Sequence, residues 1–335
     1  MRIIGLVNET SGACYHRVYT PIMNMDCDSH ITNKLTEEQL QKGCDILVIN
    51  RFAFYNPIDE IKKWRDKYQF KLVIDIDDYW ELPSSHILFD NWDFNNISNI
   101  IIEYMIMADI VTCTHERLYE RISVYNQNVY ILPNAIPHNF EQFVMQKETS
   151  ENVRIMYQGS ITHMHDVELL RNPMKKVYSD SQLRQKISTT FGGHVRNLVD
   201  SNSMLSAFTC GLRLKPMIFT GMSPMEYYQI YNHADICIVP LVDSKFNKYK
   251  SNLKILEAAY AGIPVIASHI NPYLDFPEDC VLYAKTKKDW YTYIKMLTDI
   301  EYTRESYGRN LQDFCELHYN FKDINNERKI IYETR

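Results

Sequence analysis

The sequence predicts an α/β fold with two facing Rossmann-like domains, each built on a parallel sheet. Short β-branched segments alternate with helical segments along the chain, which is typical of a parallel sheet covered by helices. The alternation occurs twice, and a polar stretch without periodicity separates the two runs at residues 138–152. A length of 335 residues suits two domains of ordinary size. We therefore expect domains at residues 1–148 and 149–315, followed by a helical segment at 316–335.

The composition excludes several classes of protein. Hydrophobic residues make up 45% and charged residues 23% of the chain, and a formal net charge of −6 indicates no general attraction to nucleic acid. The eight cysteines are scattered without zinc-like spacing, which is typical of buried thiols in a reducing compartment. No apolar run approaches the ~20 residues that cross a bilayer, and the first predicted strand begins at residue 2 without a signal peptide before it. We expect a cytoplasmic protein.

The first domain begins with two apolar strands and a helix. Residues 2–7 form the first predicted strand and residues 44–51 the second. Asn56 is placed to cap the following helix, and Pro57 suits the first helical position. One side of this helix, within residues 62–68, is basic and aromatic. We expect a solvated surface there, and a peripheral contact with a membrane or a lipid-linked acceptor is the alternative.

The strand predicted at residues 71–76 ends in a group of acids. Asp77 and Asp78 follow it at the carboxyl edge of the sheet, where ligands of open α/β sheets bind. Adjacent side chains of an extended chain point to opposite sides, so we expect one of these carboxylates to face the ligand cleft, where it could accept a hydroxyl proton. Asp75 and Asp77 also have the DxD spacing with which GT-A transferases hold a divalent metal. Capping of the next turn is a third interpretation.

The second domain begins with a strand at about residues 153–158 and a polar turn. Gly159 and Ser160 form this turn, and His163 lies in the polar run after it. Asp166 ends that run and is a further candidate for the site; capping of the next helix by Thr162 and Asp166 is the alternative, and both roles are compatible. Further strands are predicted near residues 187–193, 215–221 and 235–241, the last of which precedes a lysine-rich loop.

The most informative stretch is the loop, helix and strand at residues 248–268. Ser251 or Asn252 is placed to cap the helix, Leu253 begins its apolar side, and Gly262 occupies the position of a C-terminal cap. The loop and the first turn contain three lysines: Lys248, Lys250 and Lys254. Exposed amides, the helix dipole and ammonium groups together predict an anion site for a phosphate or a pyrophosphate. Simple solvation of these lysines is the alternative.

The segment KSNLKILEAAYAGIPVIAS resembles the donor-site signature of nucleotide-sugar glycosyltransferases with the GT-B architecture, in the large retaining group called glycosyltransferase family 1/4-like. In that group, the glutamate at the position of Glu257 binds the nucleotide ribose. The group's second glutamate, eight residues earlier, is replaced here by Tyr249. The segments ADIVTCT and LPNAI, at residues 108–114 and 132–136, resemble the end of the first GT-B domain.

The resemblance implies a donor site in the second domain. Its glycine turn lets the backbone approach the donor phosphates, and polar residues of the lysine-rich loop hold them. The implied donor-binding residues are Gly159, Ser160, His163, Lys250, Ser251, Asn252, Leu253 and Glu257. The resemblance also implies a C-terminal helix that crosses back to the first domain, a UDP or GDP sugar as donor, retention of the anomeric configuration, and no required metal or other cofactor.

We therefore expect a glycosyltransferase that moves a sugar from a nucleotide-diphosphate sugar to a hydroxyl of a glycan, a lipid-linked molecule or another acceptor. Lys254 would neutralise the leaving diphosphate, and Asp77 or Asp78 would serve the acceptor. Two alternatives remain from the residues. One is a metal-dependent GT-A-like transferase that uses Asp75 and Asp77; the other is a catalytically weak nucleotide- or sugar-binding module, which Tyr249 suggests.

Overall fold

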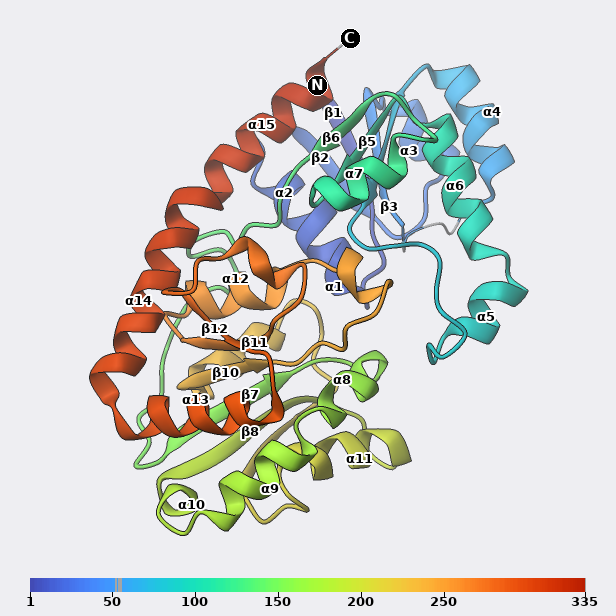
Figure 1. The fold of residues 1–335 in the computed structure, drawn as a ribbon. Helices are drawn as coiled ribbons and strands as arrows, with labels where there is room; N and C mark the ends of the chain where they lie inside the picture. Colours follow the sequence, from blue (N-terminus) through green and yellow to red (C-terminus); the bar gives the residue numbers. More distant parts are fainter. Residues whose placement is uncertain (52, 54–55, 335) are drawn as a thin grey trace. The chain divides into compact units, whose positions relative to one another are not determined.

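The computed structural model describes residues 1–51, 53 and 56–334, and the chain divides into two compact units. The first unit comprises Met1–Pro137, Tyr249–Ser251 and the chain from Asn320 onward. The second unit comprises His138–Lys248 and Asn252–Tyr319. Each unit contains a six-stranded sheet whose strands are paired in parallel (Figure 1). The predicted α/β architecture of two Rossmann-like domains is confirmed.

The sheet of the first unit has the strand order β2-β1-β3-β4-β5-β6. Its strands are β1 (Arg2–Leu6), β2 (Asp28–Thr32), β3 (Ile46–Asn50), β4 (Lys71–Ile76), β5 (Ile110–Cys113) and β6 (Val129–Ile131). The register places Asn50 beside Asp75, and Asp75 beside Thr112. The carboxyl ends of the three central strands therefore bring polar residues together at one edge.

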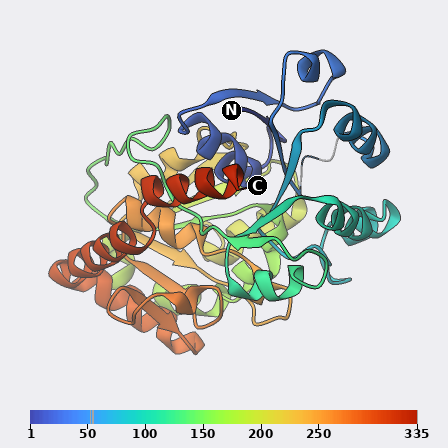
Figure 2. The same ribbon diagram turned by 90° about the horizontal axis from the view of Figure 1, so that it is seen from above.

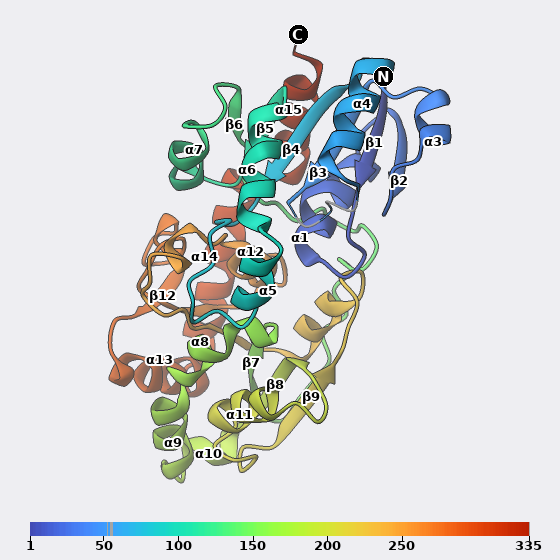
Figure 3. The ribbon, with the colours of Figure 1, turned by 90° about the vertical axis from the view of Figure 1, so that its right-hand side faces the viewer.

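Helices cover both faces of this sheet. They are α1 (Gly12–Cys14), η1 (Tyr15–Tyr19, a π-helix), α2 (Thr20–Met23), α3 (Glu37–Gln41), α4 (Ile58–Tyr68), α5 (Phe89–Phe94), α6 (Ile97–Met107), α7 (Glu116–Ile122) and α15 (Phe321–Glu333). Helices α2 and α15 lie on one face, and α4 and α6 lie on the other (Figures 1 and 3).

The C-terminal helix α15 packs on the first unit. Figure 2 shows α15, in red, beside the blue segment that contains α2. The Asn325 side chain donates a hydrogen bond to the Pro21 carbonyl at 3.0 Å, and Lys71, at the start of β4, donates to the Tyr332 carbonyl at 2.8 Å. The expected crossing of the last helix back to the first domain is therefore present.

Asn56 does not cap α4, contrary to the prediction from the sequence. Pro57 occupies the N-cap position. The Asn56 side chain instead accepts from the Leu35 amide at 3.0 Å and donates to the Leu35 carbonyl at 3.1 Å. Because Asn56 is buried, its amide group satisfies a neighbouring loop instead of the helix end.

The sheet of the second unit has the order β12-β11-β10-β7-β8-β9. Its strands are β7 (Val153–Gln158), β8 (Ile187–His194), β9 (Pro216–Thr220), β10 (Ile236–Val239), β11 (Val265–Ser268) and β12 (Val281–Ala284). Its helices are η2 (Ile161–His163), α8 (Met164–Glu168), α9 (Arg171–Ser179), α10 (Leu183–Lys186), α11 (Val199–Phe208), η3 (Tyr227–His233), η4 (Asn247–Tyr249), α12 (Leu253–Tyr260), η5 (Tyr273–Asp275), α13 (Lys287–Asp299) and α14 (Glu301–His318). Helices α9, α11 and α13 share a core on one face, whereas α12 lies on the other (Figure 1).

The stretch at residues 138–152, which the sequence predicts as a linker, is anchored to the second unit. The Asn139 amide donates to the Tyr260 hydroxyl at 3.0 Å, and that hydroxyl donates to the Phe143 carbonyl at 2.7 Å. The Phe143 side chain is fully buried. The division between the units consequently falls after Pro137, earlier than the predicted boundary at residue 148.

Candidate functional site

Helix α12 begins and ends close to where its sequence predicts. Asn252 occupies the N-cap position, although its side chain donates to the Tyr319 hydroxyl at 3.2 Å instead of capping the helix. Gly262 has a φ of +64° just beyond the helix, as a C-terminal cap requires. A Cβ on Gly308 of α14 would lie 2.2 Å from the Gly262 carbonyl oxygen, so α14 packs tightly against this end. These contacts hold the C-terminal end of α12, and its first turn lies at the opposite end.

Two glycines, Gly159 after β7 and Gly193 near the end of β8, lie close together. A Cβ on Gly193, whose φ is +85°, would lie only 2.2 Å from the Gly159 carbonyl oxygen. The Gly159 amide donates to the Gly192 carbonyl at 3.3 Å. Only glycine permits this approach between the ends of β7 and β8.

Lys254 lies beside this turn. A Cβ on Gly159 would be 3.0 Å from the Lys254 Nζ and 2.4 Å from the Tyr157 hydroxyl oxygen. The ammonium lies 5.4 Å from the centre of the Tyr157 ring. The turn after β7 and the first turn of α12 therefore bring Gly159 and Lys254 together in the second unit.

His163 is held by a neighbouring acid. Its Nδ1 lies 2.8 Å from one Asp166 carboxylate oxygen. The other Asp166 oxygen accepts from the Val242 amide at 2.8 Å and from the Asn247 side chain at 3.2 Å. Asp166 is therefore a buried anchor that orients the His163 ring, and it joins the turn after β7 to the loop after β10. Ser160 is exposed, and its hydroxyl lies 2.7 Å from that of Thr162.

Glu257 is buried among tyrosines of η3. Its two carboxylate oxygens accept from the hydroxyls of Tyr227 and Tyr231, the latter at 2.8 Å. The Tyr228 hydroxyl donates to the Glu257 main-chain carbonyl at 3.0 Å. Burial raises the pKa of Glu257 to about 7, although the two tyrosine hydrogen bonds and Lys254 favour the ionised form. Binding of a ribose by Glu257 stays a prediction, and it requires the ligand to share or replace a tyrosine hydroxyl.

Asp75 is committed to a buried ion pair in the first unit. Arg17 from η1 donates to both Asp75 oxygens, at 3.0 and 2.8 Å, and both side chains are almost fully buried. Thr112 of β5 donates to the same carboxylate at 2.7 Å, and Asn50 of β3 donates at 3.2 Å. The carboxylate thus ties together three strand ends, and these contacts oppose the interpretation of Asp75 and Asp77 as a DxD metal site.

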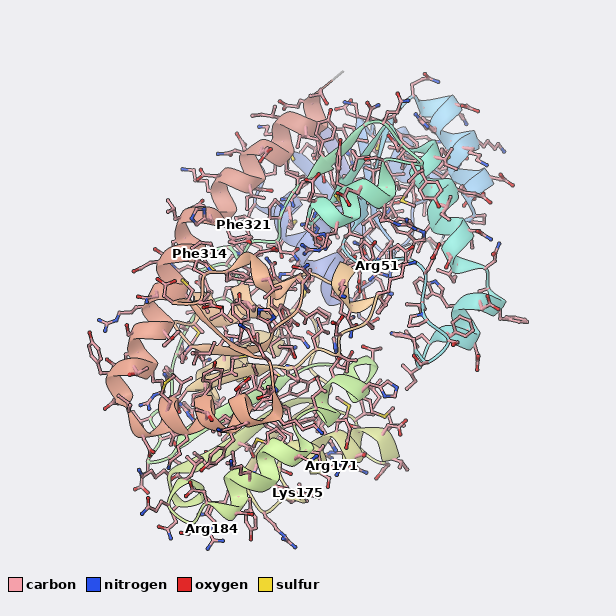
Figure 4. The ribbon with its side chains drawn as sticks, viewed as in Figure 1. Arg51, Arg171, Lys175, Arg184, Phe314 and Phe321 are labelled. Atoms are coloured by element: carbon pink, nitrogen blue, oxygen red, sulfur yellow. The ribbon has the colours of Figure 1, made fainter. Side chains whose placement is uncertain are left out.

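Asp77 and Asp78 meet at one arginine. The Arg51 Nε donates to Asp77 at 2.9 Å, and an Arg51 terminal nitrogen lies 3.4 Å from Asp78. Arg51, labelled in Figure 4, follows directly after β3. The expectation that the two carboxylates point to opposite sides is wrong, because β4 ends at Ile76 and the alternation of an extended strand does not continue beyond it.

The residues Tyr249–Ser251 belong to the first unit, although α12 follows them immediately in sequence. The Tyr249 ring stacks on Tyr79 with centroids 4.7 Å apart. The His115 Nε2 lies 3.2 Å from the carbonyl oxygens of both Tyr249 and Lys250, and the Lys250 Nζ lies 3.6 Å from Asp78. Lys250 thus forms an ion pair with Asp78, which lies just after β4, and its role at a donor diphosphate stays a prediction.

A polar depression lies at the same carboxyl edge of the first sheet. Its volume is about 480 Å³, and it is lined by Asn8, Glu9, Thr10, Asn33 and Lys34, from the loops after β1 and β2.

The basic side of α4 is largely engaged. Trp64 is buried, Lys67 pairs with Glu37 at 2.7 Å, and Arg65 pairs with Asp109. These pairs favour the solvated surface over the membrane contact. Within residues 1–51, 53 and 56–334, no helix has the length and apolar character to cross a membrane.

Several residues of the site were not singled out from the sequence. Two signals were present: the pair of glycines that ends β8, and the four-residue spacing of the tyrosines in η3, which places them on one side of a helical turn. The missed residues are Tyr157, Gly193, Tyr227, Tyr231 and Arg51.

Comparison with known proteins gives a match to one family and similarity to several solved structures. Residues 152–297 match the family model described as glycosyl transferases group 1. No curated protein matches the sequence. Among solved structures, HepE of Anabaena in complex with UDP and glucose has 10% identity and a TM-score of 0.66, with 98% of each chain covered. A glycosyltransferase of Rickettsia africae has 12% identity and a TM-score of 0.64, with 99% of this chain and 97% of that chain covered.

A third similar structure is longer. TarM of S. aureus, in complex with fondaparinux, α-GlcNAc-glycerol and UDP, has 13% identity and a TM-score of 0.62. The alignment covers 86% of this chain but 55% of TarM, so the chain spans about half of that protein. At these identities the solved structures show the fold, and the family match covers the second unit. The chain thus has the two-domain fold of these solved glycosyltransferases, and its residues 152–297 are similar to glycosyl transferases group 1.

Proposed function

We propose that the chain transfers a sugar from a nucleotide-diphosphate sugar, with UDP as the nucleotide, to a hydroxyl of a glycan or lipid-linked acceptor. The observation that carries the proposal is the position of the Lys254 ammonium, beside the turn of Gly159 and at the N-terminus of α12. UDP is the nucleotide present in the solved structures of HepE and TarM, and here it is the substrate class to test.

The donor chemistry requires little covalent work from the protein. As the bond between the anomeric carbon and the diphosphate breaks, negative charge grows on the leaving oxygen. The Lys254 ammonium, the first amides of α12 and the His163 ring oriented by Asp166 would neutralise that charge. Ser160 and Asn252 would add polar contacts, and Glu257 would accept hydrogen bonds from the ribose hydroxyls.

On the first unit, Asp77 or Asp78 would accept the proton of the acceptor hydroxyl. Arg51 contacts both carboxylates and holds them at the carboxyl edge of the sheet, where the polar depression of Asn8 and Lys34 also lies. We propose that the reaction retains the anomeric configuration and needs no metal. The engagement of Asp75 by Arg17 supports the second point, because Asp75 would be one of the two carboxylates of a DxD site.

The test is hydrolysis of UDP and GDP sugars, followed by mass spectrometry with and without EDTA. The wild-type protein should release nucleotide from one donor, and EDTA should not change the rate. Lys254→Ala should lose on the order of 2–4 kcal/mol of transition-state stabilisation, the usual size for one preorganised donor. Lys186→Ala is the matched control, because Lys186 is half exposed, lies outside the lysine-rich loop and pairs with Asp299 at 2.6 Å. Equal rates for Lys254→Ala and the wild type would contradict the proposal, and loss of activity with EDTA would favour the metal-dependent alternative.

A second candidate is a nucleotide- or sugar-binding module with weak catalysis. It is favoured by Tyr249, which occupies the position of a family glutamate and stacks on Tyr79 in the first unit. Calorimetry that shows binding of a UDP sugar, together with no release of nucleotide in the hydrolysis screen, would support this candidate.

A further inference from the structure

The hydroxyl group of Tyr157 has an unusual environment. Tyr157 lies on β7, two residues before the turn at Gly159, and its side chain is 1% exposed. Its ring packs with those of Phe191 and Phe208, whose centroids lie 5.4 and 6.0 Å away. Within the described part of the chain, its buried hydroxyl oxygen has no hydrogen-bond partner. A phenylalanine would serve this aromatic packing equally well, and an unbonded buried hydroxyl destabilises the folded state.

The Lys254 ammonium borders the same space as this hydroxyl. A Cβ on Gly159 would lie 2.4 Å from the Tyr157 oxygen and 3.0 Å from the Lys254 Nζ. Glycine at position 159 is what leaves room for both atoms. Burial raises the pKa of Tyr157 well above its usual value, so the group stays a neutral hydroxyl whose oxygen lone pairs accept from a cation.

A lysine ammonium needs more than one partner in such a site. It carries three N–H donors on a flexible four-carbon stem, and two phosphate oxygens would use only part of that capacity. A further acceptor on the protein side would help to hold the charge in place. Tyr157 is the neutral acceptor that the fold puts there.

We propose that Tyr157 is a positioning residue: its hydroxyl oxygen accepts a hydrogen bond from the Lys254 ammonium when a donor diphosphate is bound, and this bond holds the ammonium against the phosphates. The inference rests on the proposed function and adds to it a residue that acts through Lys254. It gives a role to a buried tyrosine hydroxyl that has no hydrogen-bond partner among the described residues. Binding of the diphosphate recovers the lost hydrogen bond and thereby adds to the affinity.

The test is a double-mutant cycle with UDP, or with GDP if UDP does not bind, measured by calorimetry. The four proteins are the wild type, Tyr157→Phe, Lys254→Met and the double variant. Tyr157→Phe should weaken nucleoside diphosphate binding about tenfold in the wild-type background, as expected for a hydrogen bond to a charged group. It should have no effect in the Lys254→Met background, because a residue that acts through another has non-additive effects. Affinity for uridine, which has no phosphate, should not change.

Tyr104→Phe is the control for removal of a tyrosine hydroxyl. Tyr104 is also 1% exposed, but its hydroxyl donates to the Asn56 carbonyl at 3.1 Å in the first unit. This variant should lower the melting temperature and leave UDP affinity unchanged. Tyr157→Phe should show the opposite pattern, with a melting temperature that is equal or higher.

Three outcomes would overturn the inference. Wild-type affinity in Tyr157→Phe would show that the hydroxyl is not used. If Tyr157→Phe weakens UDP binding equally in the wild-type and Lys254→Met backgrounds, the hydroxyl does not act through Lys254. If Tyr157→Phe lowers the melting temperature, the hydroxyl has a structural role. If Lys254→Met weakens UDP binding and Tyr157→Phe does not, only the inference fails. If the wild type binds neither UDP nor GDP, the proposed function fails, and the inference fails with it.

Discussion

Glu257 should make the stability of this protein depend on pH. Its pKa is raised from the ordinary 4.5 to about 7, mainly because burial disfavours the charged form. Between these values the folded protein holds a proton that the unfolded chain has released. Stability is therefore greatest below about pH 4.5 for this group, and it is lost as the pH rises through 7. This difference in pKa between the folded and unfolded states corresponds to about 3 kcal/mol in the free energy of unfolding.

The perturbation is Glu257→Gln, which keeps a hydrogen-bond acceptor for the tyrosines of η3 but does not titrate. Chemical denaturation at about pH 5 and about pH 8 gives the free energy of unfolding of both proteins, and other titrating groups cancel in the difference. The wild type should lose on the order of 3 kcal/mol more than the variant over this range. Glu168→Gln is the control: Arg171 holds the pKa of this exposed glutamate below its usual 4.5, so its carboxylate stays ionised between about pH 5 and about pH 8 and the variant should leave the pH dependence unchanged.

Parallel pH profiles of the wild type and Glu257→Gln would refute this reasoning. Such a result would mean that Glu257 is ionised in the folded protein throughout the range, with the hydroxyls of Tyr227 and Tyr231 compensating its burial. A matching rise of UDP affinity in the wild type, as Glu257 ionises near pH 7, would in turn support its assignment to the ribose.

Three further predictions concern the turn after β7, the buried ion pair and the acids after β4. Gly159→Ala should cost about 1–3 kcal/mol of stability and weaken UDP binding, because the new Cβ would overlap the Tyr157 hydroxyl. If denaturation and calorimetry give wild-type values, the turn can adjust to a side chain at this position. Arg17→Met should cost about 3–5 kcal/mol in urea denaturation, because Asp75 stays buried without its cation, and Asp75→Asn in the same protein should recover part of the loss. One of Asp77→Asn and Asp78→Asn should lose roughly 10²-fold in transfer at constant UDP affinity, whereas joint loss of UDP binding with an EDTA effect would favour a metal site.

Local sequence signals predicted the helix and strand boundaries where glycine or proline ends an element. Gly262 and Pro264 mark the end of α12 and the start of β11, and the structure has both boundaries within a residue or two of the prediction. Strand β2 (Asp28–Thr32) was not predicted, because it is a polar edge strand without an apolar run. Its pairing with β1 depends on the sheet and not on its own residues.

The types of residue in the candidate site were predictable, but their partners were less so. Lys254 follows Lys250 by four positions, and this short spacing alone predicts that the two lysines belong to one cluster. In the structure, Lys250 pairs with Asp78 in the first unit, whereas Lys254 lies at the turn of Gly159 in the second. The difference is set by the stacking of Tyr249 on Tyr79, a contact between residues distant in sequence. No local pattern encodes such a contact.

For Asp75, in contrast, the sequence pattern was sufficient to predict a structural role. It lies inside a strand between Ile74 and Ile76, and a central strand of a parallel sheet is buried on both faces. A carboxylate at such a position requires a cation and hydrogen-bond donors, since a buried charge without them is strongly unfavourable. That requirement is met by Arg17 and Thr112. Position within the strand therefore separates Asp75, which is structural, from Asp77 and Asp78, which follow the strand and remain candidates for the chemistry.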